Sequence, residues 1–227
     1  MKHQGKASQA ARRIILVSFI LLAAILLAGF LAKIIGTVVV ALAAALVVIW
    51  ILFIAFTLYF FRDPTARVPA GYNFVVAPAH GTIDAIEDFS ENEVMGGPCR
   101  RISIFLNVFN VHVQQAPVSG TVTFVKHTSG LFLNAMKTDS ATHNENVLIG
   151  FESAENPSEK IGVRLIAGLI ARRIIPWVNA GDAVAMGERI SLVQFGSRAD
   201  LYLPLHYKIS AKLGDKTVGG ETIVATK

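Results

Sequence analysis

A long apolar stretch near the amino terminus places the strongest constraint on how this chain folds. Residues 14–61 carry one charged side chain, Lys33, whereas the sequence after Arg62 is polar and rich in turn-forming residues. Residues 14–32 and 34–61 each reach the roughly 20 apolar residues that a helix needs to cross a bilayer. A cleaved signal peptide has a shorter apolar region of about 7–15 residues. We therefore expect a retained membrane anchor that consists of two transmembrane helices.

Basic residues on both sides of this stretch predict its orientation. They are Lys2, Lys6, Arg12 and Arg13 before it, and Arg62 and Arg67 after it. Because cytoplasmic loops carry an excess of Lys and Arg, a helical hairpin would leave residues 1–13 and 62–227 on the cytoplasmic side of the inner membrane. The short connector near Lys33 leaves two alternatives, one long tilted helix or a hairpin that dips into one leaflet.

Charge and cysteine content exclude several classes of protein. The chain has a net charge of +5, but its basic residues form no long run and no platform of interleaved aromatic residues. This pattern favours anionic lipid over nucleic acid as a partner. The single cysteine, Cys99, excludes an intramolecular disulfide framework and a cysteine-based zinc site. The histidines lack the close paired spacing of a dedicated metal site, so we expect no metal.

Short apolar runs separated by turn residues predict that residues 62–227 are mainly β. The runs are Phe74–Val76, Arg101–Leu106, Gly120–Val125, Ile161–Ile166 and Arg189–Val193. A short helix is expected over Gly168–Ile175, ended by Pro176. These features predict a β-sandwich or hybrid barrel with short helices, preceded by the helical hairpin.

Two further patterns support this architecture. The segment Ala77–Ile83 resembles Ala116–Val122, which lies 39 residues later in the chain. A duplicated hairpin-like unit would explain this echo. The segment Val178–Ile190 also resembles the turn-and-strand signature of biotinyl and lipoyl carrier domains.

The dipeptide Gly196-Ser197 follows an apolar strand and is suited to self-cleavage. Glycine lacks a Cβ, so its carbonyl is open to attack and its backbone tolerates unusual angles. The Ser197 hydroxyl can attack this carbonyl to form an ester; elimination and hydrolysis would then leave a pyruvoyl group at position 197. The products would be chains 1–196 and 197–227. By spacing alone, an ordinary turn is the better explanation of Gly-Ser.

Several separated segments together resemble the short bacterial and archaeal type of phosphatidylserine decarboxylase. They span nearly the whole chain and are Phe60–Pro64, Ala77–Gly81, Ile104–Val113, Ala116–Gly120, Asn144–Asn146, Ile166–Gly168, Ala171–Ile174 and Phe195–Arg198. The resemblance implies cleavage between Gly196 and Ser197, and a pyruvoyl cofactor that Ser197 supplies. Phosphatidylserine would be the substrate, and phosphatidylethanolamine and CO₂ the products.

The resemblance also implies roles for other residues and partners. His112 matches the family histidine that acts as base in self-cleavage and transfers a proton in decarboxylation; its reference pKa of about 6.5 suits both directions. Arg172 and Arg173 are candidate contacts for the lipid phosphate, with a solvated helix end as the alternative. The two chains would remain associated after cleavage, and a homodimer is expected from the family only.

The chain departs from the family pattern at two acidic positions. The family turn has a carboxylate that orients the histidine where this chain has His80, and another acidic position is Asn110 here. We expect Asp84, Asp88 or Glu145 to supply the missing charge, or His80 and Asn110 to orient His112 by hydrogen bonds alone. Loss of such a carboxylate costs about 10⁴ in rate in a serine-protease triad. A catalytically silent, structural family member is therefore an alternative.

A second alternative is a membrane-tethered biotinyl carrier. Its motivation is the segment Val178–Ile190 together with Ala135-Met136-Lys137, which partly matches the biotin attachment motif. Biotin acceptors usually have a second Met where this chain has Thr138, and such a carrier gives the Gly196-Ser197 segment no role.

Overall fold

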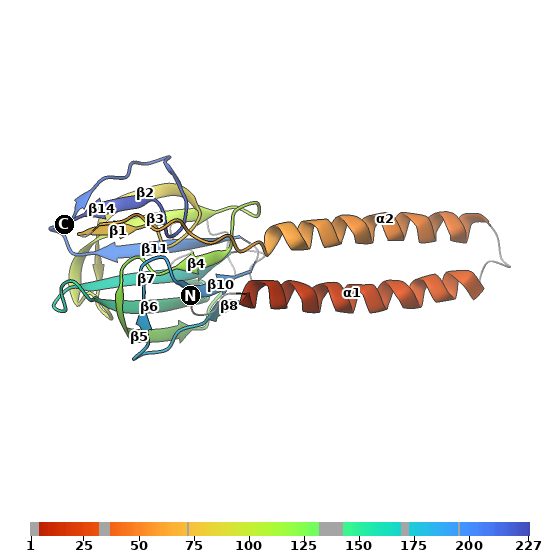
Figure 1. The fold of residues 1–227 in the computed structure, drawn as a ribbon, viewed down its shortest axis with the longest axis horizontal. Helices are drawn as coiled ribbons and strands as arrows, with labels where there is room; N and C mark the ends of the chain where they lie inside the picture. The colour runs from red at the N-terminus through yellow and green to blue at the C-terminus, as the bar shows by residue number, and fades with distance from the viewer. Residues whose placement is uncertain (1–4, 32–36, 72, 132–142, 169–172, 195) are drawn as a thin grey trace. The chain divides into compact units, whose positions relative to one another are not determined.

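The computed structural model describes the whole chain except residues 1–4, 32–36, 72, 132–142, 169–172 and 195. The described chain divides into two compact units. We call Gly5–Asp63 the helical unit and Pro64–Lys227 the β unit (Figure 1).

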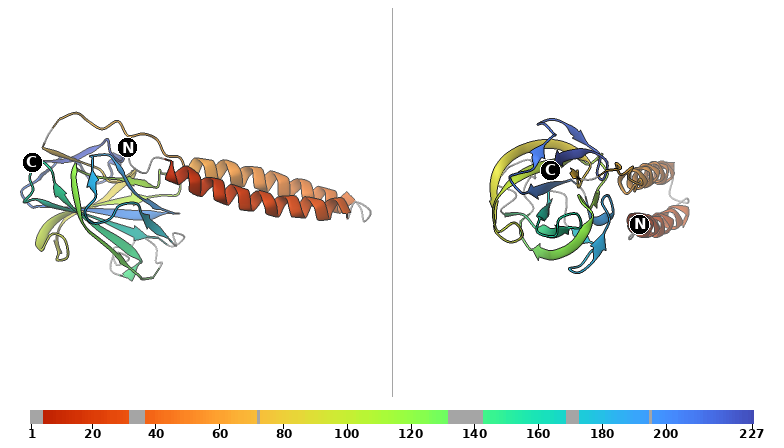
Figure 2. Two further views of the ribbon diagram at one scale, coloured as in Figure 1. Left: turned by 60° about the horizontal axis from the view of Figure 1, so that its bottom comes forward. Right: turned by 60° about the vertical axis from the view of Figure 1, so that its left-hand side comes forward.

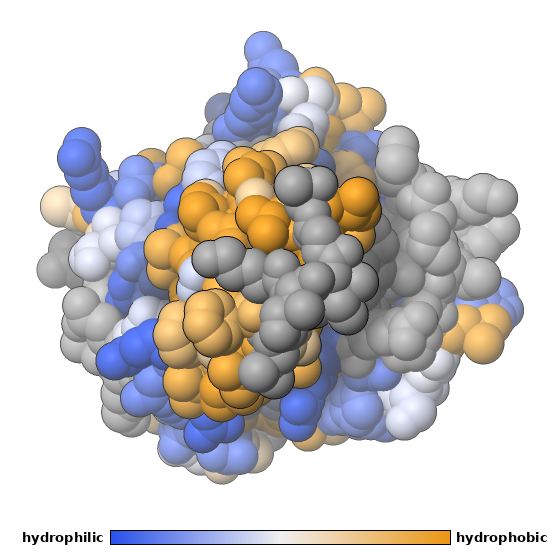
Figure 3. All heavy atoms as spheres, turned by 90° about the vertical axis from the view of Figure 1, so that its right-hand side faces the viewer, coloured by the Kyte–Doolittle hydropathy of each residue, from blue (hydrophilic) through white to orange (hydrophobic). Residues whose placement is uncertain are grey.

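The helical unit consists of two long apolar helices, α1 (Lys6–Leu31) and α2 (Thr37–Phe60). Each is long and apolar enough to span a membrane by length and composition. Their outward-facing side chains are largely hydrophobic, as Figure 3 shows for one face. A helix that is apolar all round is suited to a lipid environment rather than to water.

The two helices pack against each other in opposite directions. The rings of Phe19 in α1 and Trp50 in α2 lie 5.6 Å apart. Nearer the connection between the helices, Gly29 faces Ala43, because a Cβ at Gly29 would lie 3.8 Å from the Cβ of Ala43. The predicted helical hairpin agrees with this packing, and the alternative of one long helix is wrong.

The β unit is built from antiparallel strands, which confirms the predicted mainly β fold (Figure 1). The strands are β1 (Phe74–Val76), β2 (Gly81–Glu91), β3 (Gly97–Leu106), β4 (Val113–Gln115), β5 (Gly120–Thr128), β6 (Asn146–Ser153), β7 (Lys160–Ala167), β8 (Ile174–Pro176), β9 (Ala183–Val184), β10 (Arg189–Val193), β11 (Ser197–Leu203), β12 (Lys208–Ile209), β13 (Lys216–Thr217) and β14 (Ile223–Thr226). Each of the five predicted strands coincides with all or part of one of these.

The strands form one large sheet and two small ones around a common core. The large sheet has the order β13-β2-β3-β11-β7-β6-β5-β9, and the small sheets have the orders β1-β14-β12 and β4-β10-β8. Figure 2 shows the strands curling around the interior. Strand β11 lies near the middle of the large sheet, where Ala199, Leu201 and Leu203 point into the core. The curled sheet therefore places the first residue of β11, Ser197, inside a hydrogen-bonded framework.

The prediction of a helix over Gly168–Ile175 is wrong for its carboxyl-terminal residues. Ile174 and Ile175 belong to β8, and Ile174 pairs with Val193 of β10. Two β-branched residues favour an extended backbone, and Pro176 is tolerated because β8 is an edge strand. Residues 169–172 of the expected helix lie outside the described residues.

The sequence similarity between Ala77–Ile83 and Ala116–Val122 has a counterpart in the structure. The amide of Val76 donates to the Pro117 carbonyl at 3.0 Å, and the amide of Gln115 donates to the Pro78 carbonyl at 2.8 Å. These bonds join equivalent positions of the two copies reciprocally. This symmetric pairing agrees with the predicted duplicated unit.

A further repeat accompanies this duplication. Ile83 accepts a hydrogen bond from the amide of Gly214 at 2.8 Å and donates one to the Asp215 carbonyl at 2.9 Å. Val122 makes the equivalent two bonds, at 2.7 and 2.8 Å, with the Gly-Asp pair at residues 181–182. The carrier-like signature of residues 178–190 therefore has a second copy around Gly214. The sequence analysis missed this copy, although residues 181–190 and 214–223 share the pattern Gly-Asp-x4-Gly-Glu-x-Ile.

Candidate active site

Ser197 is a buried serine at the start of β11. Its backbone pairs with Leu106 of β3 on one side and with Ala167 of β7 on the other. The residue is only 1% exposed, and its Oγ has no hydrogen-bond partner among the residues that the structure describes. A buried hydroxyl without a partner costs free energy, so the contacts among the described residues give this hydroxyl no stabilising role.

Gly196 links this serine to the preceding strand through an unusual backbone conformation. Its φ is +72°, a left-handed conformation that residues with a Cβ rarely adopt. The glycine is half-buried, whereas Ser197 immediately after it is buried. The Gly-Ser junction therefore lies where the chain turns into the sheet.

His112 is fully buried and lies against this junction. The amide of Gly196 donates a hydrogen bond to His112 Nε2 at 3.2 Å, and His112 Nδ1 lies 2.9 Å from the Asn110 carbonyl. A backbone N–H can only donate and a carbonyl can only accept, so the proton is on Nδ1 and the lone pair is on Nε2. The structure thus directs the basic nitrogen of His112 at the Gly-Ser junction.

Two polar side chains that the sequence analysis missed hold the backbone of His112. The Nε2 of Gln114 donates to the His112 carbonyl at 2.8 Å, and Ser191 Oγ donates to Gln114 Oε1 at 2.7 Å. The amide of Val193 donates to the same carbonyl at 3.1 Å. Both Gln114 and Ser191 are fully buried. The sequence gives little sign of them, because each lies in a short strand that holds another polar residue, Gln115 in β4 and Arg189 in β10.

Asn110 orients His112 through its backbone rather than through its side chain. The Asn110 side chain instead accepts a hydrogen bond from the amide of Asn107 at 2.9 Å, while Asn107 Oδ1 accepts one from the amide of Phe109 at 2.9 Å. These bonds fix the turn that presents the Asn110 carbonyl to the imidazole. The expectation that hydrogen bonds can orient His112 therefore holds for Asn110, by way of its backbone carbonyl.

The three carboxylates expected as replacements are engaged elsewhere. Asp84 forms an ion pair with Arg198, Asp88 lies 2.6 Å from Arg100, and Glu145 lies 3.1 Å from His127. These three ion pairs do not involve His112.

The other predicted site residues are His80, Arg172 and Arg173. His80 is half-buried and directly precedes β2, the strand next to β3. Arg173 is exposed, and its carbonyl accepts a hydrogen bond at 3.2 Å from the amide of Gln194, which lies three residues before Ser197. Arg172 lies outside the described residues, as does Lys137, the expected biotin attachment point. The structure thus brings His112, Gly196 and Ser197 together and places the backbone of Arg173 near them.

Asn144 supports the strand beside Ser197. It is buried, and its Nδ2 donates to the Ala167 carbonyl at 2.7 Å. Since Ala167 is the partner of Ser197 in β7, this bond fixes one wall of the site. No cluster of His, Cys, Asp or Glu within the described part of the chain could hold a metal ion.

Buried charges lie on the other face of β11, which points away from the core. Arg198 is 3% exposed and pairs with Asp84, while Asp200 is fully buried with Arg101 Nη1 3.7 Å from its Oδ2. Burial raises the pKa of Asp200, although Ser103 and the two arginines oppose this shift. These ion pairs fasten the first residues of β11 to β2 and β3.

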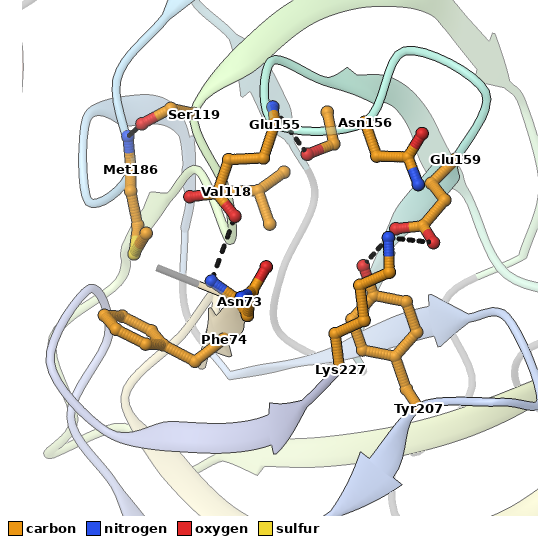
Figure 4. A pocket seen from close by; sticks show the side chains of 11 residues that line it. Asn73, Phe74, Val118, Ser119, Glu155, Asn156, Glu159, Met186, Tyr207 and Lys227 are labelled. Carbon is orange, nitrogen blue, oxygen red and sulfur yellow. Dashed lines mark hydrogen bonds and ion pairs between the residues drawn. The ribbon is translucent and has the colours of Figure 1, made fainter. Parts of the chain in front are cut away.

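A separate polar pocket gathers around Glu159 (Figure 4). Its carboxylate accepts a hydrogen bond from Tyr207 Oη at 2.6 Å and lies 2.8 Å from Lys227 Nζ and 3.0 Å from His206 Nε2. Burial raises the pKa of Glu159, but these three partners outweigh it and hold the pKa below its usual value. Neither His112 nor Ser197 lines this pocket.

The described chain combines two apolar helices that are compatible with membrane association and a curled β unit in which a buried serine and a buried histidine lie at one Gly-Ser junction. A family model described as phosphatidylserine decarboxylase matches residues 53–225. This chain therefore belongs to the phosphatidylserine decarboxylase family, which confirms the resemblance seen in the sequence and the prediction of a decarboxylase.

Relatives from three bacteria agree with this assignment, and each is named phosphatidylserine decarboxylase proenzyme. The relative from Desulfotalea psychrophila is 44% identical over 78% of this chain and 81% of its own length. The relative from Magnetococcus marinus is 41% identical over 77% of this chain and 79% of its own length. The relative from Azorhizobium caulinodans is 45% identical over 74% of this chain and 72% of its own length.

Proposed function

We propose that this protein decarboxylates phosphatidylserine to phosphatidylethanolamine and CO₂, with a pyruvoyl group made by self-cleavage between Gly196 and Ser197. Membership of the family supports the substrate, and the word proenzyme in the names of its relatives supports processing. The observation that carries self-cleavage is the hydrogen bond from the Gly196 amide to His112 Nε2, beside the unpartnered Ser197 hydroxyl.

Self-cleavage uses groups that already lie at the junction. Ser197 Oγ attacks the carbonyl carbon of Gly196 while its proton moves to His112 Nε2. The peptide C–N bond breaks, the nitrogen of Ser197 takes up the proton, and an ester joins the Gly196 carbonyl to Ser197 Oγ. Loss of the Ser197 α proton then breaks the Cβ–Oγ bond, which releases the Gly196 carboxylate. Addition of water expels ammonia and leaves the pyruvoyl group on residue 197.

The surroundings of Ser197 fit a pyruvoyl group. The residue is buried between two strands, and its Oγ has no partner to lose when the hydroxyl is eliminated. The group supplies an electron sink for the electron pair left by departing CO₂. His112, held in one tautomer by the Asn110 carbonyl, then exchanges protons with the product carbon. The neighbouring strands keep bulk water away from this step.

The two chains should remain associated after cleavage. Residues 197–227 contribute β11, which pairs with β3 and β7, and β14, which pairs with β1. Tyr207 and Lys227 of this segment also hold Glu159 of the larger chain (Figure 4). Separation would break a continuous sheet, so we expect release only on unfolding. A homodimer remains a proposal from the family.

The proposed location is the inner membrane, with the β unit on the cytoplasmic side. Both candidate membrane spans lie at the amino end of the chain. Basic residues flank the apolar stretch 14–61 at both ends, for example Arg13 and Arg62. Positive flanks favour the cytoplasmic side. This orientation would place the β unit next to the anionic lipids of the inner leaflet.

Intact-mass spectrometry of the purified protein tests this proposal. We expect chains 1–196 and 197–227, with the smaller bearing the mass of an amino-terminal pyruvoyl group. Ser197→Ala should remain intact, whereas Ser210→Ala, which changes an exposed serine in the same segment, should cleave normally. Cleaved protein should release CO₂ from phosphatidylserine. An intact wild-type chain would contradict self-cleavage and favour a silent family member.

A further inference from the structure

Two large apolar side chains are exposed next to the candidate site. Phe109 is 63% exposed and Leu131 is 57% exposed. Arg173, also exposed, lies on a third segment. We call these three residues the site rim. Single exposed apolar residues are common on protein surfaces, so the position of these residues relative to Ser197 decides whether they matter.

Two residues of the site rim stand next to the strands that flank Ser197. Phe109 follows the end of β3, whose last residue, Leu106, pairs with Ser197. On the other side, the carbonyl of Leu131 accepts from the amide of Glu145 at 3.0 Å, and the carbonyl of Glu145 accepts from the amide of Ala167 at 2.9 Å. Ala167 is the second strand partner of Ser197.

The third member of the site rim comes from the segment before the junction. The Arg173 carbonyl accepts a hydrogen bond from the amide of Gln194 at 3.2 Å. Gln194 directly follows β10 and begins the short segment that leads to Gly196. Apolar groups and one cation therefore meet at the end of the β unit where β11 begins.

Phe109 is held in its exposed position. Its amide donates to Asn107 Oδ1 at 2.9 Å, within a turn that Asn110 closes through the amide of Asn107 at 2.9 Å. This is the turn that also supplies the carbonyl to His112. The turn thus fixes the backbone at Phe109, beside the segment that holds His112.

We propose that the site rim contacts the lipid bilayer, with Phe109 and Leu131 in the interfacial region and Arg173 against anionic headgroups. This inference rests on the proposed function. Ser197 is buried, so a lipid headgroup must be delivered to it from a membrane close to this end of the β unit. Aromatic rings are favoured at the membrane interface, and cations are attracted to anionic lipid surfaces. The β unit begins at Pro64, shortly after α2 ends at Phe60, so it stays near the bilayer.

Labelling of engineered cysteines tests this contact directly. The chain has one cysteine, Cys99, which is fully buried and can be replaced by Ser. An environment-sensitive fluorophore is attached at Phe109→Cys, and in a matched protein at Leu205→Cys. Leu205 is 47% exposed and follows the end of β11 opposite Ser197, so it controls for exposure alone. Both full-length proteins are reconstituted in phosphatidylserine-phosphatidylcholine vesicles that contain a nitroxide-labelled lipid.

The two labels should respond oppositely to lipid and to water. We expect the nitroxide lipid to quench the label at 109 at least twofold more than the label at 205, and aqueous iodide to quench the label at 205 more. Equal quenching of both labels by iodide would overturn the inference. The quenching of the two labels does not depend on self-cleavage. A negative result can therefore be distinguished from failure of the proposed function.

A kinetic test links the contact to turnover. In vesicles, Phe109→Ser should lower kcat/KM for long-chain phosphatidylserine by about tenfold, while the mass of the cleaved chains stays normal. Turnover of a water-soluble, short-chain phosphatidylserine should change much less, since it needs no bilayer contact. An equal loss on both substrates would assign Phe109 to the site itself and overturn the membrane contact.

Discussion

Nε2 of His112 accepts a hydrogen bond of 3.2 Å from the amide of Gly196, the residue that precedes the proposed cleavage bond. The two residues are far apart in sequence, and pairing of β4 with β10 brings their segments together. The same imidazole is fixed at Nδ1 by the Asn110 carbonyl. A backbone carbonyl thus performs the orienting role that a carboxylate has in the family pattern.

His112→Gln should slow self-cleavage strongly. General-base catalysis contributes about 10²–10⁴-fold, and Gln retains hydrogen-bonding capacity but cannot take up the proton. The measurement is the rate at which newly made protein converts to two chains on a denaturing gel. His206→Gln is the control, because His206 is exposed and pairs with Glu159 instead. Normal cleavage in the His112 variant would remove this residue from the mechanism.

Asn110→Asp should be tolerated better than Asn110→Ala. The Asp side chain can still accept the hydrogen bond from the amide of Asn107, whereas Ala cannot. Loss of this bond should cost about 1 kcal/mol in the free energy of unfolding and loosen the turn that holds His112. Thermal melts and cleavage rates of both variants test this. Equal behaviour of the two would mean that the side chain does not support the turn.

Glu91→Gln should destabilise the protein at pH 7 but not in acid. Burial raises the pKa of Glu91, but the amides of Met95, Val94 and Glu93 together with Arg164 outweigh it and hold the pKa below its usual value. Such a group stabilises the fold above its unfolded pKa of about 4.3, and this contribution is lost as pH falls through the lower folded pKa.

Urea unfolding at pH 7 and near pH 3 measures this difference. The variant should lose about 1–3 kcal/mol at pH 7, and the gap from wild type should close in acid. Glu93→Gln is a suitable control because Glu93 is more exposed and pairs with Lys126 at the surface. A gap that does not change with pH would show that the charge of Glu91 is not responsible.

The anchor and much of the β framework could be predicted because each depends on a local pattern. The uninterrupted apolar stretch gives α1 and α2, and short apolar runs between turn residues give strands such as β3 and β10. The segment Ile174–Pro176 shows the limit of this reasoning. A short apolar run before a proline fits either a helix end or an edge strand, and only pairing with β10 decides between them.

The candidate site could be expected from the family resemblance, but the residues that support it could not. Gly196, Ser197 and His112 were singled out because their segments match the family pattern, whereas their residue types alone also fit an ordinary turn and a core histidine. Gln114 acts through its contacts to other residues, and Asn110 acts on His112 through a backbone atom that every residue has. Such roles follow from three-dimensional placement, which residue type does not encode.

Glu159→Gln should let the smaller chain leave more easily after cleavage. Glu159 belongs to chain 1–196, whereas its partners Tyr207 and Lys227 belong to chain 197–227 (Figure 4). Its third partner, His206, also belongs to chain 197–227. The substitution removes the charge that holds Lys227, at a cost of about 1–3 kcal/mol. With a typical dependence of stability on urea, this moves chain separation to a lower concentration by about 1 M.

Size-exclusion chromatography of the cleaved protein in increasing urea measures this separation. Glu155→Gln is the matched control from the same pocket, since Glu155 accepts a hydrogen bond from the amide of Asn73, which lies in the same chain. This variant should leave the separation point close to that of wild type. If both variants release the smaller chain at the same urea concentration as wild type, then strand pairing of β11 and β14 alone holds the two chains together.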